Sequence, residues 1–531
     1  MQTIKTKRKD IVDFFLKKGL LINQDLLKHL EDEKNLSDFC KLIEGDNSRD
    51  VAVLSDKTRD LLGHEQNLQL NWLELEKFKA TSEKRGNDDN HLFEQILVHD
   101  VQDKTKEKTK LDNNVKIILS YDKTPKKREA SDFIQYFNNR YQAIEKILKQ
   151  RQELQNTTSI NRLINKRDRE QVAVIGMVQD KRQTKNGNCI LTVEDKTGYM
   201  NVLVNKNRLD LFRVAQDVVL DEVIGVVGVS GNNIIFANSL LFPDIPLTKE
   251  IKKAKEEAYA LFLSDIHVGS KNFLEDDFNR FLKWINCGLG SKIQREIASK
   301  VKYIFIVGDL VDGCGVYPNQ EKELEIKDIK DQYKVCADFL SKIPQKIKLI
   351  VCPGNHDAMR LAEPQLPLYK DFAEPIYNLP NVTMVSNPSV VNIHSSDNFP
   401  GFDVLVYHGY SFDFYFAEVE SIRNKGGYDR ADLLMKFLLQ KRHLAPSYTS
   451  TLHVPDADTD LLFIDKIPDF FVSGHIHKAA AANYKNITLI SGSCWQSKTA
   501  FQEKVGHNPE PSRVPIVNLQ TRHIKMLKFG K

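Results

Sequence analysis

The sequence predicts a multidomain α+β fold, in which a helical N-terminal domain and a small β-barrel precede a large α/β layered domain. Length and composition allow this fold, because 531 residues suffice for three or four domains and an apolar fraction of 41% suffices for folded cores. The pattern along the chain supports it. Helical spacing gives way to a polar stretch and then to strand-like runs, and the second half alternates apolar runs with helical stretches.

The first predicted unit is a small helical domain over residues 1–75. Ile11, Phe14 and Phe15 recur at the spacing of one helix face, and Gly19 ends that helix. The same three residues resemble part of a sliding-clamp peptide, although the glutamine expected in such a peptide is absent. We favour an ordinary helical core here and keep binding to a sliding clamp as the alternative.

A change in composition marks the next segment, residues 76–114. It is rich in charged and polar residues and almost free of large apolar ones, so we predict a flexible linker. An apolar island at residues 92–98 interrupts it. This island fits either a docking segment or a single helix or strand of a folded domain.

Residues 115–250 are predicted to form a β-rich domain with a preceding helix. A short strand is expected at Val115–Leu119, and apolar residues spaced three and four apart predict an amphipathic helix over Asp132–Gln150. The strands expected after it are Val172–Val178, Ile190–Glu194, Met200–Val204, Val218–Val229 and Ile234–Ala237. Five short strands joined by tight turns look like an oligonucleotide-binding (OB-type) barrel.

A barrel of this class can bind single strands by stacking bases on aromatic side chains over a basic groove. The strand positions expected to be exposed contain few aromatic residues here, Tyr199 being one of them. We therefore favour a structural or subunit-contact role for this barrel over DNA binding.

Residues 251–531 show the pattern of an α/β layered domain with buried strands, including helical stretches such as Asp277–Trp284 and Asp328–Leu340. The expected strands are Ala260–Leu263, Tyr303–Val307, Leu349–Val351, Val404–Tyr407, Phe470–Val472 and Thr488–Ile490. A motif rich in metal-ligand side chains follows each of the first five. These motifs are Asp265-Ile266-His267, Gly308-Asp309-Leu310-Val311-Asp312-Gly313, Gly354-Asn355-His356-Asp357, His408-Gly409 and Gly474-His475-Ile476-His477.

Together the five motifs predict a site for two divalent cations. Loops at the strand ends of such a sheet gather at one rim, and glycines allow the backbone to turn tightly there. The candidate ligands are two carboxylates, one amide and four imidazoles: Asp265, His267, Asp309, Asn355, His408, His475 and His477. Oxygen and imidazole ligands without thiolate suit manganese, iron or zinc better than calcium, and we choose Mn²⁺.

We expect Asp309, which has two carboxylate oxygens, to bridge both ions, and Asn355 to supply a neutral oxygen that does not repel a phosphodiester. Two ions about 3.5–4 Å apart activate a water and stabilise charge on the scissile phosphate. The remaining ligands divide between the ions, with Asp265, His267 and His477 at the first and His408 and His475 at the second.

The third motif also contains the candidate catalytic residue. His356 follows Asn355 and is suited to general acid catalysis, because the pKa of an imidazole lies near neutrality. We expect Asp357 to orient His356, and Asp312 to support the ligands without binding metal itself.

Charge and cysteine content narrow the class of protein. The net charge of +4 is nearly balanced, so any surface that binds nucleic acid must be a local patch. Seven scattered cysteines without a Cys-x-x-Cys pair argue against a zinc ribbon or a disulfide framework and fit a reducing compartment. We see no signal peptide and no apolar run of about 18 residues, and therefore expect a cytoplasmic protein without a membrane span.

The five motifs resemble those of the calcineurin-like metallophosphoesterase superfamily, over roughly the last half of the chain. The order of helical domain, charged linker, OB-type barrel and phosphoesterase domain is similar to that of the small subunits of archaeal D-family DNA polymerase, also called DNA polymerase II. Three segments are similar to that family in particular: Ser264–Ser270, Gly492–Gln502 and Val514–Val517. One departure follows the fourth motif, where we expected a second acid after Asp413 and the chain has Phe414.

This resemblance implies a proofreading 3′→5′ exonuclease that acts on DNA 3′ ends, either single-stranded or mismatched primer termini, beside a large catalytic polymerase subunit. The B-subunits of eukaryotic replicative polymerases have a similar architecture but have lost the metal ligands, whereas this chain keeps every ligand position. Two alternatives stay open: a catalytically silent scaffold B-subunit, and a phosphatase or cyclic-nucleotide phosphodiesterase of the same superfamily. Trp495 and Phe501 are candidate anchors for the large subunit, although core packing explains them equally well.

Overall fold

The computed structural model describes the chain from residue 115 onward almost completely. The residues that it does not describe are 1–20, 23–52, 55–114, 125, 165–168 and 531. The expected N-terminal helices, the clamp-like peptide and the linker with its apolar island lie outside the described residues. Among the N-terminal residues that the structure does describe, a two-residue parallel ladder joins β1 (Leu21–Ile22) to β2 (Val53–Leu54). The predicted helical domain did not include this ladder.

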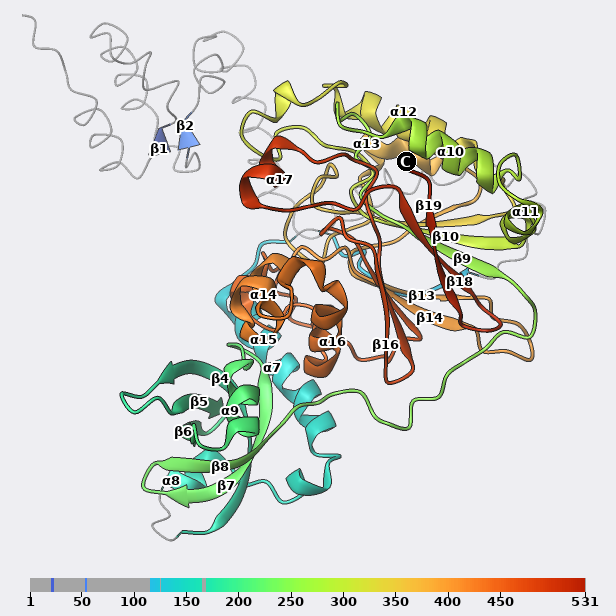
Figure 1. The fold of residues 1–531 in the computed structure, drawn as a ribbon. Coiled ribbons are helices and arrows are strands. Elements are labelled where there is room, and N and C mark those ends of the chain that lie inside the picture. The colour runs from blue at the N-terminus through green and yellow to red at the C-terminus, as the bar shows by residue number, and fades with distance from the viewer. Residues whose placement is uncertain (1–20, 23–52, 55–114, 125, 165–168, 531) are drawn as a thin grey trace, which may run out of the picture. The chain divides into compact units, whose positions relative to one another are not determined.

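The C-terminal part of the described chain contains two six-stranded sheets, with helices on the outer face of each (Figure 1). The first sheet has the order β12-β11-β10-β9-β18-β19 and the second has the order β16-β17-β15-β14-β13-β3. The strands of the first are β9 (Tyr259–Leu263), β10 (Val301–Val307), β11 (Lys348–Cys352), β12 (Val382–Met384), β18 (Arg513–Asn518) and β19 (Ile524–Lys528). Those of the second are β3 (Val115–Ser120), β13 (Ser389–Ile393), β14 (Phe402–Val406), β15 (Phe470–Ser473), β16 (Ala480–Tyr484) and β17 (Ile487–Ser491).

Both faces of the central strands are buried, which explains why they read as continuous apolar runs. Every residue of β9 is buried, with Phe262 facing the second sheet and Leu261 facing the helices. Phe262 stacks on Phe305 of β10 and contacts Phe470 of β15, with ring centroids 5.3 and 6.2 Å apart. The mixed α/β class predicted from the sequence is confirmed.

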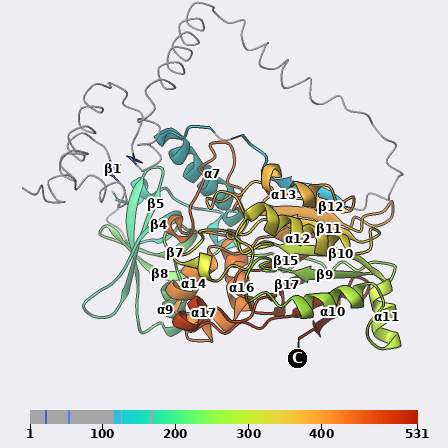
Figure 2. The same ribbon diagram turned by 90° about the horizontal axis from the view of Figure 1, so that it is seen from above.

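Helices α10 (Glu275–Ile285), α12 (Ile329–Ser341) and α13 (Lys370–Tyr377) cover the first sheet, whereas α14 (Phe412–Glu418) and α16 (Ala431–Lys441) cover the second (Figures 1 and 2). The short helices α11 (Lys292–Ser299), α15 (Glu420–Arg423) and α17 (Ala500–Val505) lie in the connections.

Trp495 belongs to the core of the first layer. Its ring is 1% exposed and meets Phe278 of α10 edge to face at 4.8 Å. Of the two interpretations left open from the sequence, the structure therefore supports core packing for Trp495, because the core around α10 encloses its ring. Phe501 is exposed.

A closed five-stranded barrel precedes this domain, in the order β4-β5-β6-β8-β7, and confirms the predicted barrel. Its strands are β4 (Gln171–Gln183), β5 (Cys189–Asp195), β6 (Gly198–Val204), β7 (Val223–Gly231) and β8 (Ile234–Leu241). Strand β7 begins five residues later than expected, because a turn at Asp221, with φ of 64°, separates it from Val218. A helix that was not predicted, α9 (Leu209–Gln216), precedes that turn.

The segment before the barrel divides between the two folded parts. Strand β3 pairs with β13, so that residues 115–120 belong to the second sheet of the layered domain. The sequence-based prediction had grouped these residues with the barrel. Helix α7 (Ala130–Leu148) then packs on the barrel, where the Tyr141 hydroxyl donates to the Ile175 carbonyl at 3.0 Å. The same helix also contacts the layered domain, where Arg140 and Asp460 form an ion pair of 2.8 Å. Strand β3 thus forms one edge of the second sheet, although the other strands of this sheet lie far away in sequence.

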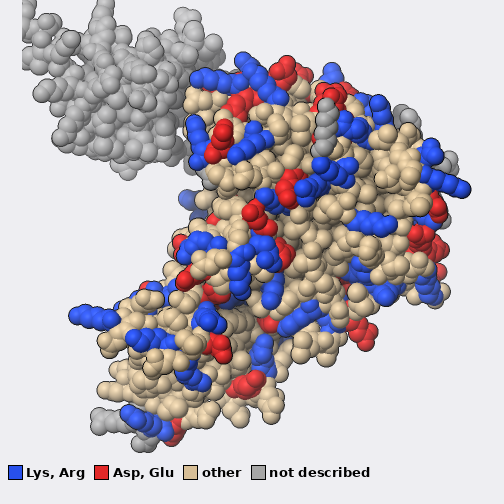
Figure 3. All heavy atoms as spheres, viewed as in Figure 1, with Lys and Arg blue, Asp and Glu red and all other residues tan. Residues whose placement is uncertain are grey.

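The described residues carry surface charge of both signs and include no helix suited to a membrane. On the face shown in Figure 3, basic and acidic side chains intermingle over the described residues. No helix in the described part of the chain combines the length and the apolar character needed to cross a membrane.

Candidate metal centre

The five motifs follow β9, β10, β11, β14 and β15, and the structure brings their side chains together. Five of the seven candidate ligands have left-handed backbone conformations, with φ of 52° to 71°: Asp265, His267, Asp309, His475 and His477. This conformation costs an L-residue about 1–2 kcal/mol. Such strain persists only where the surrounding structure enforces it, and it is concentrated at functional sites.

Two glycines make this close approach possible. A Cβ atom on Gly354 would overlap Oδ1 of Asp309, and one on Gly308, whose φ is 79°, would overlap the ring of His408. Any larger residue at either position would push a candidate ligand out of place.

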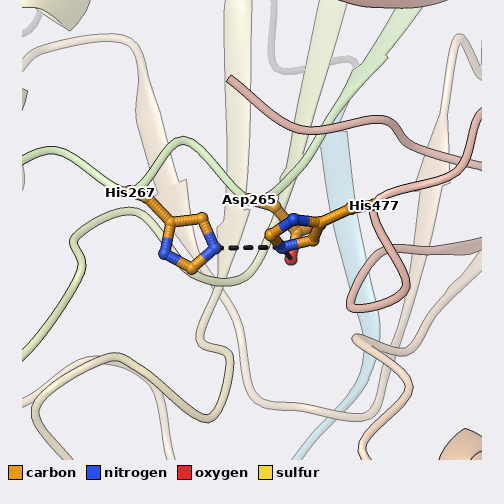
Figure 4. Close-up of side chains that lie close together, drawn as sticks. All are labelled: Asp265, His267 and His477. Atoms are coloured by element: carbon orange, nitrogen blue, oxygen red, sulfur yellow. Dashed lines mark hydrogen bonds and ion pairs between the residues drawn. The ribbon is translucent and has the colours of Figure 1, made fainter. Parts of the chain in front are cut away.

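The first cluster consists of Asp265, His267 and His477 (Figure 4). The Nε2 atoms of His267 and His477 lie 3.1 Å apart, and Nε2 of His477 lies 3.4 Å from Oδ1 of Asp265. All three side chains are buried. Two imidazole nitrogens and a carboxylate oxygen that face one another are a donor set suited to one transition-metal ion.

The second cluster lies on the other side of Asp309. Nε2 of His408 lies 3.4 Å from Oδ2 of Asp309 and 3.0 Å from Oδ1 of Asn355. Nδ1 of His475 lies 2.9 Å from the same amide oxygen. Asp309 also lies 3.9 Å from Nε2 of His267, so its carboxylate touches both clusters, as a bridging ligand must.

Backbone contacts fix which nitrogen of His408 faces the site. Nδ1 lies 2.8 Å from the carbonyl oxygen of Val307 and can donate to it, which leaves Nε2 as the ring nitrogen that faces Asp309 and Asn355. A metal-binding histidine uses its second ring nitrogen in this way. The residues present therefore fit a pair of divalent cations.

Electrostatics favour positive charge between these residues. Burial raises the pKa of Asp309, but the imidazoles of His408 and His356 outweigh it and hold the pKa well below the usual range of a carboxyl. Burial likewise lowers the pKa of His408, yet Asp309 raises it to about 10. The buried carboxylates thus attract cations, and divalent metal ions would supply that charge.

Asp312 supports the first cluster from behind. Its Oδ1 lies 3.1 Å from Nδ1 of His267, and the same carboxylate accepts hydrogen bonds from Gln320 and Gln496 at 3.0 and 2.8 Å. A carboxylate in this place fixes the ring orientation of a metal-binding histidine and raises its basicity. The supporting role of Asp312 stays a prediction, and the variant described next tests it.

We predict that Asp312→Asn weakens manganese binding by about 10- to 100-fold, because the amide keeps the shape but loses the charge that polarises His267. Calorimetric titration of the full chain with MnCl₂ measures this change. Asp338→Asn, on the exposed face of α12, is the control and should bind manganese like the unmodified chain. Equal affinities in the two variants would contradict the role assigned to Asp312.

His356 lies at the edge of the centre, only partly buried. Its backbone N–H donates to Oδ1 of Asp309 at 2.8 Å, and its Nδ1 lies 2.8 Å from the carbonyl oxygen of Asp312. The Nε2 atom is therefore the ring nitrogen left to exchange a proton with a substrate. His356, His267 and Asp309 also form a third group with ligand atoms close together, so the ring lies within reach of the metal centre.

Asp357 does not contact His356, and the expectation that it orients that ring is wrong. Its buried carboxylate accepts instead from the Gly354 N–H at 2.9 Å and from the Tyr333 hydroxyl at 3.0 Å. Burial, followed by the charge of Asp309, raises the pKa of Asp357 to about 7. Asp357 thus holds the loop that carries Asn355.

Several residues of the site carry no motif that the sequence analysis could use. Asp413 lies 3.0 Å from Nε2 of His475, and the amide nitrogen of Gln502 lies 2.9 Å from Nδ1 of His477. Gln502 could have been noticed from its immediate sequence, because Thr499 and Gln502 form the capping box of α17. For Asp413 and Gln496 no local signal exists, since their partners lie far away in sequence.

A cavity of 270 Å³ opens over the centre. It reaches His267, Asp309, His356, His475 and His477, so a substrate can approach both clusters. A larger cavity of 1150 Å³ beside α7 is lined by none of the candidate ligands, and the chemistry places the site in the smaller one.

The chain is similar to known proteins. Residues 259–479 match the model of the calcineurin-like phosphoesterase family. The chain is 39% identical over 403 residues to the DNA polymerase II small subunit of Methanothermobacter thermautotrophicus, covering 76% of this chain and 80% of that protein. The protein of the same name from Archaeoglobus fulgidus is 38% identical over 403 residues, covering 76% and 78%.

A third relative differs in length. The DNA polymerase II small subunit of Pyrococcus furiosus is 39% identical over 397 residues, which cover 74% of this chain and 63% of that protein. The chain therefore spans less than two thirds of this relative.

Proposed function

The chain belongs to the family of archaeal DNA polymerase II small subunits, and from this premise we propose that its phosphoesterase domain is a two-metal 3′→5′ exonuclease acting on DNA. The observation that carries the proposal is the convergence of all seven candidate ligands on two adjoining clusters bridged by Asp309. Strained, buried and mutually polarised groups of this kind belong to functional sites far more often than to scaffolds.

The contacts of these residues suggest which cation each ligand would bind and which residue would transfer a proton. Asp265, His267 and His477 would hold one cation, and Asn355, His408 and His475 the other, with Asp309 shared between them. When bound, the two cations supply an activated water nucleophile and offset the charge of the phosphodiester. His356, through Nε2, would hold or donate the proton that the leaving 3′ oxygen takes up.

The family is also the basis for the partners, the substrate and the location that we propose. We propose that a large catalytic subunit carries the polymerase chemistry, that single-stranded or mismatched primer termini are the substrate, and that the pair works in the cytoplasm. The barrel, which we assign to the OB type, is the proposed subunit contact. A sliding clamp remains a candidate partner for the N-terminal residues.

The direct test is manganese-dependent digestion of single-stranded DNA labelled at its 3′ or its 5′ end. The full chain should be assayed alone and with the large subunit. Stepwise loss of the 3′ label, with a ladder of shortened 5′-labelled products, is the expected result. Faster hydrolysis of small phosphoesters than of DNA would favour the phosphatase alternative.

His356→Ala is expected to lower the rate of this digestion by about 10²- to 10⁴-fold, the usual contribution of a positioned general acid. Manganese binding should persist, because the seven ligands remain. His523→Ala removes an exposed histidine outside the centre and should digest DNA at the unmodified rate. If His356→Ala retained full activity, or the unmodified chain bound manganese without cleaving DNA, the scaffold alternative would replace this proposal.

A further inference from the structure

The cavity over the metal centre is lined in part by aromatic rings that the proposed metal chemistry does not use. They are Tyr317, Tyr410, Tyr428 and Phe501. Among the described residues that line this cavity, none is Lys or Arg. Aromatic rings are suited to stacking on the face of a nucleobase, and the proposed cations would contact its phosphate.

Two of these rings form a surface beside the candidate general acid. Tyr317 and Phe501 stack with centroids 6.2 Å apart and an angle of 25° between their planes. Phe501 is 54% exposed, an unusual state for a phenyl ring. The ring of Tyr317 lies 6.3 Å from that of His356, so a base resting on this surface would belong to a nucleotide at the reaction centre.

The surface is held rigidly. The Tyr317 hydroxyl donates to Glu323 at 3.1 Å, which fixes the direction of its ring. Phe501 lies on α17, whose N-terminus is closed by hydrogen bonds between Thr499 and Gln502. Because Gln502 also contacts His477, one turn of helix positions both the exposed ring and a candidate metal ligand.

We propose that Tyr317 and Phe501 form a stacking platform for the base of the 3′-terminal nucleotide, and that these two rings determine the selection of the unpaired 3′ ends proposed above. The inference rests on the proposed exonuclease function and adds the residues that select its substrate. A paired base keeps its faces covered by its neighbours in the duplex and must be unstacked before it can reach the platform. A mismatched or single-stranded terminal base offers its face more readily.

A binding assay tests the platform without turnover. The full chain carrying His356→Ala is titrated with single-stranded DNA that has 2-aminopurine at its 3′ end, whose fluorescence falls when the base stacks. We expect quenching on binding. Adding Phe501→Ala should remove the quenching and weaken binding about 10-fold, whereas Phe501→Tyr should retain both. Tyr199→Ala, which removes an exposed ring from the barrel, is the matched control and should change neither.

A second assay separates this inference from the proposed function. The otherwise unmodified chain digests single-stranded DNA that ends in either a normal or an abasic 3′ nucleotide. We expect KM to be about 10-fold lower for the normal end, and Phe501→Ala to abolish that difference. Digestion that ignores the terminal base, together with unchanged 2-aminopurine quenching in Phe501→Ala, would overturn the platform and leave the exonuclease in place. Absence of digestion of any DNA would instead overturn the exonuclease.

Discussion

Replacing Asp309 by asparagine is expected to abolish the manganese-dependent nuclease activity that we propose, while leaving the fold intact. The carboxylate lies 3.4 Å from His408 and 3.9 Å from His267, and so contacts a histidine of each cluster. Asparagine keeps the oxygen that accepts from the His356 N–H but removes the shared negative charge. Metal ions contribute several kcal/mol to transition-state stabilisation and each 1.36 kcal/mol is tenfold in rate, so we expect a loss of at least about 10³-fold.

Thermal unfolding shows whether the loss comes from the metal. A ligand that binds only the folded state at 100 times its Kd stabilises that state by about 2.7 kcal/mol, so manganese should raise the Tm of the unmodified chain. Asp309→Asn should lose most of this increase, whereas Asp338→Asn should keep it. A variant that retains the manganese-induced increase and full activity would refute the bridging role of Asp309.

The sequence predicted those elements whose burial leaves a local pattern. Each of the runs that became β9, β10, β11 and β15 is continuously apolar, because the sheet is covered on both faces. Strand β18 escaped prediction, since its place depends on an antiparallel pairing of Val517 with Ala260, far away in sequence. That pairing adds β18 to the first sheet, but it leaves no periodic signal within the sequence of β9 or of β18.

The candidate site divides in the same way. Histidine and aspartate beside glycine at strand ends form recognisable motifs, so every proposed ligand could be named from the sequence. The contacts that orient them could not. Gln496 donates to Asp312 across 184 residues, and glutamine at an arbitrary loop position has no distinctive neighbourhood in the chain. Asp357 shows the converse error, because adjacency to His356 in sequence suggested a contact that the loop geometry replaces with one to Gly354.

Lys441→Met is expected to destabilise the fold by about 3–5 kcal/mol, the usual effect of removing one partner of a buried ion pair. Lys441 of α16 and Glu222, which directly precedes β7, lie 2.7 Å apart with their side chains 4% and 2% exposed. The ammonium group also lies 3.6 Å from the ring centroid of Phe242. The pair therefore joins the barrel to the layered domain, and methionine would leave the Glu222 carboxylate buried without a countercharge.

The pH dependence of this loss identifies its cause. Burial raises the pKa of Glu222 even beside Lys441, which opposes the rise, so without Lys441 the pKa should lie higher still. A carboxyl whose folded-state pKa exceeds its unfolded value of about 4.3 stabilises the fold below that pH and loses this contribution as the pH rises through the folded pKa. The deficit in unfolding free energy should therefore be small near pH 5 and grow toward pH 8 in urea titrations. The double variant Glu222→Leu/Lys441→Met should recover most of the stability at pH 8, because a matched apolar pair leaves no charge buried. A deficit that stays constant with pH, or that the second substitution deepens, would mean that lost packing around Phe242, rather than the uncompensated buried charge of Glu222, governs the stability of this junction.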